Sequence, residues 1–123
     1  MSALTHLECS GCGVHQDHTR IHNLCPACGK PLLARYDLVA ARSMTRAAVA
    51  ARPPDMWRYR EVMPDPGDYQ PMGEGFTPLL PAPRLGARHG LKRLFIKDES
   101  VNPTGSFKAR GLAAAVAMAR VRG

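Results

Sequence analysis

Four cysteines near the start of the chain constrain its fold more than any other feature. They form two Cys-x2-Cys pairs separated by twelve residues: Cys9 with Cys12, and Cys25 with Cys28. Two such pairs at this distance are typical of a tetrahedral metal site with four thiolate ligands. Gly13 and Gly29 directly follow the two pairs and permit the positive φ that a tight turn around a metal often needs. The spacing therefore predicts a metal-binding module.

Zn²⁺ in a closed structural site suits four thiolates, since no ligand position is left open for catalysis. Binding of the ion would be coupled to folding of this segment, which has few large apolar residues. Two disulfides or a redox Cys-x2-Cys pair are the alternatives. A reducing compartment disfavours the disulfides, and a redox pair needs no second copy. His22 could in principle replace one cysteine, but four thiols make the nearby histidines bystanders.

Net charge and hydropathy limit the classes of partner. The chain has 123 residues and a formal net charge of +7, which makes nucleic acid, anionic lipid and phosphorylated metabolites candidates. The basic residues are dispersed, without blocks of like charge or interleaved aromatic residues, so nucleic-acid binding is not expected. No apolar run approaches the roughly 20 residues of a membrane span. The first eight residues lack the basic start and apolar core of a secretory signal. We therefore expect a cytoplasmic protein without a membrane anchor.

A second informative stretch, Asn102–Gly111, places one lysine at the start of a helix. The β-prone run Leu94–Lys97 precedes it, Asn-Pro and Gly105 mark a turn, and apolar residues at helical spacing follow. The positive end of the helix dipole disfavours the ammonium form of Lys108, and we expect partial desolvation to disfavour it further. An uncharged amine is the nucleophile that imine formation with an aldehyde requires. The alternative is a helix-start lysine that simply reaches solvent.

Three motifs resemble parts of one enzyme family. Residues 97–111 look like the pyridoxal-phosphate (PLP) lysine segment of threonine synthases and their relatives of the second PLP-enzyme fold type, although many members carry Asp where this chain has Ala109. Residues 73–79, Gly-Glu-Gly-Phe-Thr-Pro-Leu, are similar to the family signature Gly-Glu-Gly-x-Thr-Pro-Leu. The second cysteine pair and the residues up to Asp37 resemble the N-terminal zinc ribbon of many threonine synthases.

The resemblance implies a fold, a reaction and a set of site residues. The fold class is α/β: an N-terminal zinc ribbon, then the first part of a fold-type II PLP-enzyme three-layer α/β domain, incomplete in this chain. Lys108 would be the catalytic residue and hold PLP as a Schiff base, with Phe107 and Asn102 also binding the cofactor. Asn102 could equally serve only to cap the loop. The complete lyase would convert O-phospho-L-homoserine and water into L-threonine and phosphate.

The chain divides into three predicted parts: a zinc ribbon (1–37), a helical and Pro/Gly-rich connector (38–75) and the start of the PLP-dependent domain (76–123). In the connector, we expect Ser43 to cap a helix over 44–51 and Asp55 to cap another over 56–63. A strand over 77–80 and a short helix over 84–89 follow. A strand–helix unit needs neighbouring strands to bury both its faces. We therefore expect an N-terminal portion that is inactive alone and needs a missing C-terminal part, with a homodimer as one candidate assembly.

Two other functions remain open on the sequence. One is a related PLP-dependent lyase, threonine dehydratase-like or cysteate synthase-like, although the zinc ribbon favours a threonine synthase. The other is a zinc-ribbon binding module or non-catalytic fragment, which leaves the Asn102–Gly111 stretch unexplained.

Overall fold

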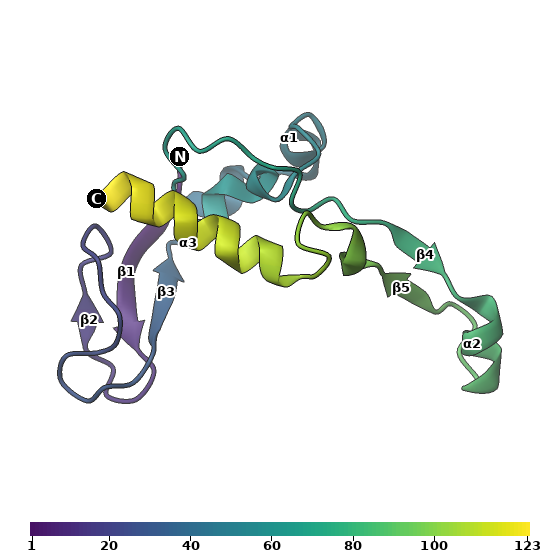
Figure 1. Cartoon of the computed structure of the whole chain (residues 1–123), viewed down its shortest axis with the longest axis horizontal. Helices are drawn as coiled ribbons and strands as arrows, with labels where there is room; N and C mark the ends of the chain where they lie inside the picture. Colours follow the sequence, from purple (N-terminus) through teal and green to yellow (C-terminus); the bar gives the residue numbers. More distant parts are fainter.

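The computed structural model describes all 123 residues and has a mixed α/β composition, as predicted. Its elements are β1 (Leu4–Cys9), β2 (His15–Gln16), β3 (Leu32–Tyr36), the 3-10 helix η1 (Ala40–Ser43), α1 (Arg46–Ala50), the 3-10 helix η2 (Met56–Val62), β4 (Leu79–Pro81), α2 (Pro83–Arg88), β5 (Phe95–Lys97), the 3-10 helix η3 (Glu99–Val101) and α3 (Lys108–Arg122). A sheet of β1, β2 and β3 lies at one end of the molecule, and β4, β5 and α2 form an arm at the other (Figure 1).

The N-terminal sheet has the strand order β2-β1-β3, and both pairings are antiparallel. Glu8 of β1 lies opposite His15 on one side and Leu33 on the other. The predicted closing strand after the cysteines is confirmed as β3. The sheet joins the connector through the Ala3 N–H, which donates to the Glu61 carbonyl at 2.8 Å.

The small core lies between η2 and α3. It contains Met56 and Trp57 from η2 and Ala113 and Ala117 from α3. Alanines four residues apart share one face of a helix, and their small side chains let η2 pack closely against α3. Trp57 is thus a packing anchor of this core.

The connector begins with caps that only partly match the sequence analysis. Asp55 caps η2 as predicted, since its carboxylate accepts from the Trp57 N–H at 2.8 Å. The prediction that Ser43 caps the first helix is wrong, because Ser43 ends η1 and its hydroxyl donates to the Ala40 carbonyl. Thr45 has the extended backbone of an N-cap instead, and its Oγ1 accepts from the Ala48 N–H at 3.1 Å.

The arm consists of β4 and β5, paired antiparallel in the register Leu79 to Lys97, with α2 between them. The predicted strand at residues 94–97 is confirmed as β5. The strand predicted over 77–80 is found as β4, which begins two residues later. Gly90 follows α2 with φ +67°, the left-handed conformation that commonly ends a helix. Leu80 and Ile96 are nearly half exposed, at 45% and 47%. An isolated two-stranded sheet is marginally stable in water, so the arm is the least protected part of the fold.

The longest helix is α3, with 15 residues. No helix in the structure combines the length and the apolar character needed to cross a membrane.

Gly75 sits where the loop before β4 passes closest to η2. Its φ is +94°, and a Cβ on this residue would lie 2.6 Å from the Met56 backbone nitrogen. Gly73 has a similar φ of +98°, but a Cβ there would meet open space, with no atom within 4 Å. Gly73→Ala and Gly75→Ala therefore share the backbone strain and differ in the steric clash.

We expect Gly75→Ala to lower the free energy of unfolding by about 1–3 kcal/mol more than Gly73→Ala, because the Met56 backbone must move. Urea unfolding followed by the fluorescence of Trp57, the only tryptophan, measures the difference. Equal losses in the two variants would contradict the close contact.

Candidate functional site

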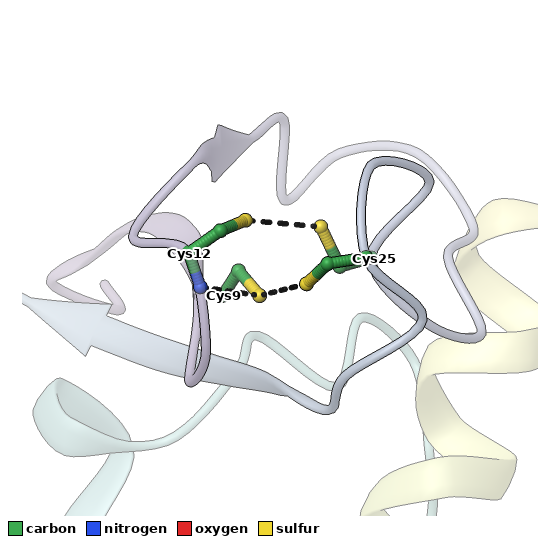
Figure 2. A group of neighbouring side chains, drawn as sticks. Cys9, Cys12 and Cys25 are labelled. Carbon is green, nitrogen blue, oxygen red and sulfur yellow. Dashed lines mark hydrogen bonds between the residues drawn. The ribbon is translucent and has the colours of Figure 1, made fainter.

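The two cysteine pairs meet in space. The Cys9 and Cys28 Sγ atoms are 3.3 Å apart, those of Cys12 and Cys25 are 3.6 Å apart, and all four lie within 4.8 Å of one another. In Figure 2, the side chains of Cys9 and Cys12 point toward the turn that carries Cys25. Sulfur atoms bound to one tetrahedral zinc lie about 3.8 Å apart, whereas those of a disulfide lie about 2.05 Å apart. The spacing fits a shared metal ion and not two disulfides.

Both pairs are carried by the same kind of turn. The Gly13 N–H donates to the Cys9 carbonyl at 3.1 Å, and the Gly29 N–H donates to the Cys25 carbonyl at 2.8 Å. Gly13 and Gly29 have φ values of +72° and +69°, as their positions predicted. In the first turn, the Gly11 and Cys12 N–H groups also approach the Cys9 Sγ, at 3.3 and 3.4 Å. Backbone N–H groups of these turns therefore lie close to cysteine sulfur atoms.

The thiols have unequal acidities. The N–H groups of Cys12 and Gly11 lower the pKa of Cys9 to about 6. The Lys30 N–H acts to lower the pKa of Cys28, but the nearby thiols, that of Cys9 first, outweigh it and raise the pKa to about 12. One thiolate thus forms readily while its neighbour resists ionisation. Binding a cation removes this resistance, since a metal-coordinated thiol is deprotonated. The donor set therefore fits a thiophilic metal ion.

The predicted catalytic lysine begins α3. Lys108 is the first residue of the helix, and the turn before it contains Gly105 with φ +68°. The Gly105 N–H donates to the Asn102 carbonyl at 2.7 Å, and the Ser106 hydroxyl accepts from the Lys108 N–H at 3.3 Å. The strand–turn–helix arrangement predicted for this stretch is confirmed.

The side-chain environment of Lys108 differs from the expectation. Lys108 is exposed, as is Phe107 beside it at 66%, so the predicted partial desolvation of the lysine is absent in this chain. The physical reason is that only one face of α3, carrying Ala109, Ala113 and Ala117, is covered. The amine makes no hydrogen bond or ion pair with the chain.

One carboxylate joins the loop before Lys108 to the Gly-Glu-Gly-Phe-Thr-Pro-Leu segment. Glu99 accepts two hydrogen bonds from the Arg110 guanidinium, at 2.7 and 2.8 Å. Its Oε1 accepts from the Thr77 hydroxyl at 2.6 Å, and its Oε2 accepts from the Asn102 amide at 2.9 Å. The Arg110 guanidinium, first among these groups, holds the pKa of Glu99 well below its usual range. We call Glu99, Arg110, Thr77 and Asn102 the Glu99 network, and residues 102–108 the lysine loop.

Asn102 extends this network to the glycine motif. It is buried, its Oδ1 accepts from the Gly75 N–H at 3.0 Å, and both hydrogens of its amide nitrogen are donated to Glu99. Two motifs separated by 27 residues in sequence are thereby held together. Asn102 thus caps the loop. Its contact with a cofactor stays a prediction. One lone pair of its Oδ1 is left to accept a hydrogen bond from a cofactor.

The sequence analysis assigned no individual role to four further residues: Lys97, Glu99, Arg110 and Glu74. Glu99 pairs with Arg110, and the Lys97 Nζ donates to the Thr77 carbonyl. Glu74 is 2% exposed and accepts from the Tyr69 hydroxyl and the Met72 N–H, both at 2.6 Å. The position of Glu74 inside the Gly-Glu-Gly motif was the sequence signal that could have indicated its importance.

Comparison with known proteins bears directly on these motifs. Residues 71–123, which contain both the glycine motif and Lys108, match the family model described as pyridoxal-phosphate dependent enzyme. The chain is similar to threonine synthases. That of Methanosarcina acetivorans is 32% identical over 93% of this chain, and that of Methanocaldococcus jannaschii is 35% identical over 94%. The threonine synthase of Mycobacterium leprae is 46% identical over 53% of the chain. The predicted resemblance is confirmed.

The similarity covers only part of each relative. The chain spans 28% and 29% of the lengths of the two archaeal threonine synthases, and 18% of the M. leprae enzyme. No solved structure matches the chain.

The Glu99 network generates a pH-dependent prediction. Because Arg110 lowers the pKa of Glu99 from its ordinary 4.5, the stabilisation by the Glu99 carboxylate is fully present above that value and is lost as the pH falls through the lower, folded-state pKa. Glu99→Gln should therefore be less stable than the parent at about pH 7, and the difference should shrink toward about pH 3. Urea unfolding at a series of pH values measures it.

Glu61→Gln is a matched control. Arg52 lowers the pKa of Glu61 to about 2, so this variant should show the same pH trend. Glu99 accepts a hydrogen bond from Asn102 of the lysine loop, however, whereas Glu61 pairs with Arg52. Only Glu99→Gln should speed amide hydrogen exchange at Gly75 and Gly105. A stability difference independent of pH, or equal exchange in both variants, would contradict the assignment.

Proposed function

We propose that this chain is the N-terminal part of a threonine synthase-like, PLP-dependent lyase that acts on a carbon–oxygen bond to phosphate. The complete enzyme would convert O-phospho-L-homoserine and water into L-threonine and phosphate. The observation that carries the proposal is the placement of Lys108 at a helix start, in a loop that the Glu99 network ties to the glycine motif. The threonine synthases that match the chain favour this reaction over those of related lyases.

The residues around Lys108 fit PLP. The Lys108 amine is free of any ion pair, and the preceding residue, Phe107, exposes an apolar ring. The lysine loop is fixed by hydrogen bonds of Asn102 and Ser106. When bound, PLP supplies an aldehyde for the lysine and an electron sink for the substrate.

The chain's own residues would then have distinct tasks. The Nζ of Lys108 would hold the cofactor, and it would take a proton from the substrate as general base and return it as general acid. Phe107 would offer the cofactor an apolar surface and exclude water from one side. Asn102 and Glu99 hold the loop so that the Lys108 backbone does not move when its side chain changes partners. The Glu99 network therefore contributes by positioning.

The remainder of the site would come from further polypeptide. This chain contains no glycine-rich phosphate loop beside Lys108. The outer faces of the arm and of α3 expose a series of large apolar side chains: Leu79, Leu80, Phe95, Ile96, Leu112 and Val116. Additional strands over this surface would bury it, complete a three-layer α/β domain and desolvate Lys108. The proposal includes three parts of the chain, residues 1–37, 38–75 and 76–123. It also includes that the isolated chain is inactive.

We further propose that the metal ion of the cysteine cluster is a structural Zn²⁺. Four thiols at near-tetrahedral spacing leave no open ligand position, and zinc prefers this ligand set. The short strands of the N-terminal sheet bury little apolar surface, so the ion would supply much of its stability.

Removal of this ion tests the structural role. We expect one zinc per chain to survive dialysis and to be released by a strong chelator, with loss of the β1–β3 sheet measured by amide exchange at Leu7 and Ala34. Four freely alkylatable thiols in the untreated protein would contradict the site. Exchange at Ala113 in α3 serves as the internal control, because its packing against η2 does not involve the cluster.

The enzymatic proposal is tested by trapping the cofactor. PLP added to the longest natural form of the protein should produce visible absorbance, and borohydride should then fix the cofactor on Lys108, as located by peptide mass. Lys108→Ala should abolish both signals, whereas Lys92→Ala, which removes a lysine of the arm, should leave them intact. Equal labelling of Lys30, Lys92 and Lys97, or none at all, would overturn the proposal.

A further inference from the structure

A second group of metal-ligating side chains lies on one face of the β1–β2 pair, outside the cysteine cluster. His15 lies directly opposite Glu8 in the antiparallel register, and His6 is two residues before Glu8, so all three side chains point to the same face. Their ligand atoms lie within 4.8 Å of one another. The rings of His6 and His15 stack with centroids 4.0 Å apart and an interplanar angle of 27°. Three ligands from two strands thus converge on one point.

Hydrogen bonds fix which nitrogen of His6 is available. The Thr5 hydroxyl donates its single proton to the Arg35 carbonyl at 3.0 Å. Its oxygen is also 2.9 Å from the His6 Nδ1, so in that contact the Nδ1 must be the donor. A neutral imidazole protonated at Nδ1 carries its lone pair on Nε2. The hydrogen bond to Thr5 is the kind of outer contact that fixes the tautomer of a metal-binding histidine.

The His6 Nε2 is the atom that lacks a partner. It is buried from solvent and has no hydrogen bond in the structure. A buried polar atom without a partner is unfavourable, and a charged ring would leave an N–H unpaired there instead. The His6 side chain lies on the same face of the strand pair as Glu8 and His15. A cation bound there would remove this cost.

Glu8 and His15 can supply the remaining ligands. Their side chains are 4.0 Å apart, measured from the Glu8 Oε2 to the His15 Nε2. Glu8 also accepts two hydrogen bonds from Arg35, at 3.1 and 2.8 Å. Each carboxylate oxygen has two lone pairs, so this contact orients Glu8 and leaves a lone pair for a metal.

We propose that His6, Glu8 and His15 form a second metal site, selective for Zn²⁺ or a neighbouring first-row dication that prefers imidazole. Two nitrogen ligands of one tetrahedral ion at about 2.05 Å lie about 3.4 Å apart, and the three candidate ligand atoms here lie within 4.8 Å of one another. The ion would pin the two-residue strand β2 to β1 and keep a fourth position for water. This site is independent of the proposed PLP chemistry.

The two sites should fill in a fixed order. The four thiols form a complete ligand set for a thiophilic ion, whereas the His6 site offers three protein ligands and has the Arg35 guanidinium beside Glu8. The cysteine cluster therefore binds the first ion, and the His6 site binds a second ion more weakly. The second equivalent is the quantity to measure.

The test uses the full chain with the cysteine cluster already filled by zinc, verified by thiols that no longer react with an alkylating agent. Zinc is then titrated to about 100 μM free ion and followed by calorimetry. We expect a second equivalent of zinc in the parent protein, and shifts of the ring ¹⁵N resonances of His6 and His15 alone. His15→Ala, at a largely exposed side chain, should lose the second equivalent.

His22→Ala is the matched control. His22 is half-buried, its Nε2 lies 2.9 Å from the Asp17 carbonyl, and it is not among the three clustered ligands, so this variant should keep both equivalents. Binding of one ion only, a second equivalent that survives His15→Ala, or equal losses in His15→Ala and His22→Ala would each overturn the proposal. Unreactive thiols in every variant separate loss of the second site from failure to fold.

Discussion

The carboxylate of Glu99 is the interaction on which the arrangement around Lys108 depends. It accepts hydrogen bonds from Arg110 in α3, from Thr77 before β4 and from Asn102 in the loop between them. A carboxylate is well suited to this position because its two oxygens accept several donors at once. Removing the carboxylate would leave these three donors to rearrange around a gap. The loop geometry follows from this one group more than from local turn preference.

The two ends of the molecule are stabilised by different physics. At the N-terminal end, the cysteine turns present four thiols to one point, and metal binding can supply stability that the short strands do not. In the middle, a few side chains of η2 pack against alanines of α3. The arm has only its backbone pairing and exposed apolar residues on both strands. Stability should therefore decrease from the metal cluster toward the arm, in the absence of further polypeptide.

Local signals allowed prediction of the features that depend on neighbours in sequence. The cysteine spacing, the glycine turns, the Asp55 cap and the helix start at Lys108 all came from patterns a few residues long. Ser43 was misassigned because both it and Thr45 are good caps, and the choice depends on where η1 ends. The pairing of Glu99 with Arg110 and of Asn102 with Gly75 could not be predicted, since these contacts join segments 11 and 27 residues apart through tertiary packing.

We propose that the Glu99 network holds Lys108 in position for an aldehyde cofactor. The most direct measurement is an experimental structure of the longest natural form of the protein with PLP bound. We expect continuous density between the Lys108 Nζ and the cofactor, with the hydrogen bonds of Glu99 to Arg110, Thr77 and Asn102 retained. A cofactor bound elsewhere, with Lys108 in open solvent and the Glu99 contacts broken, would contradict it.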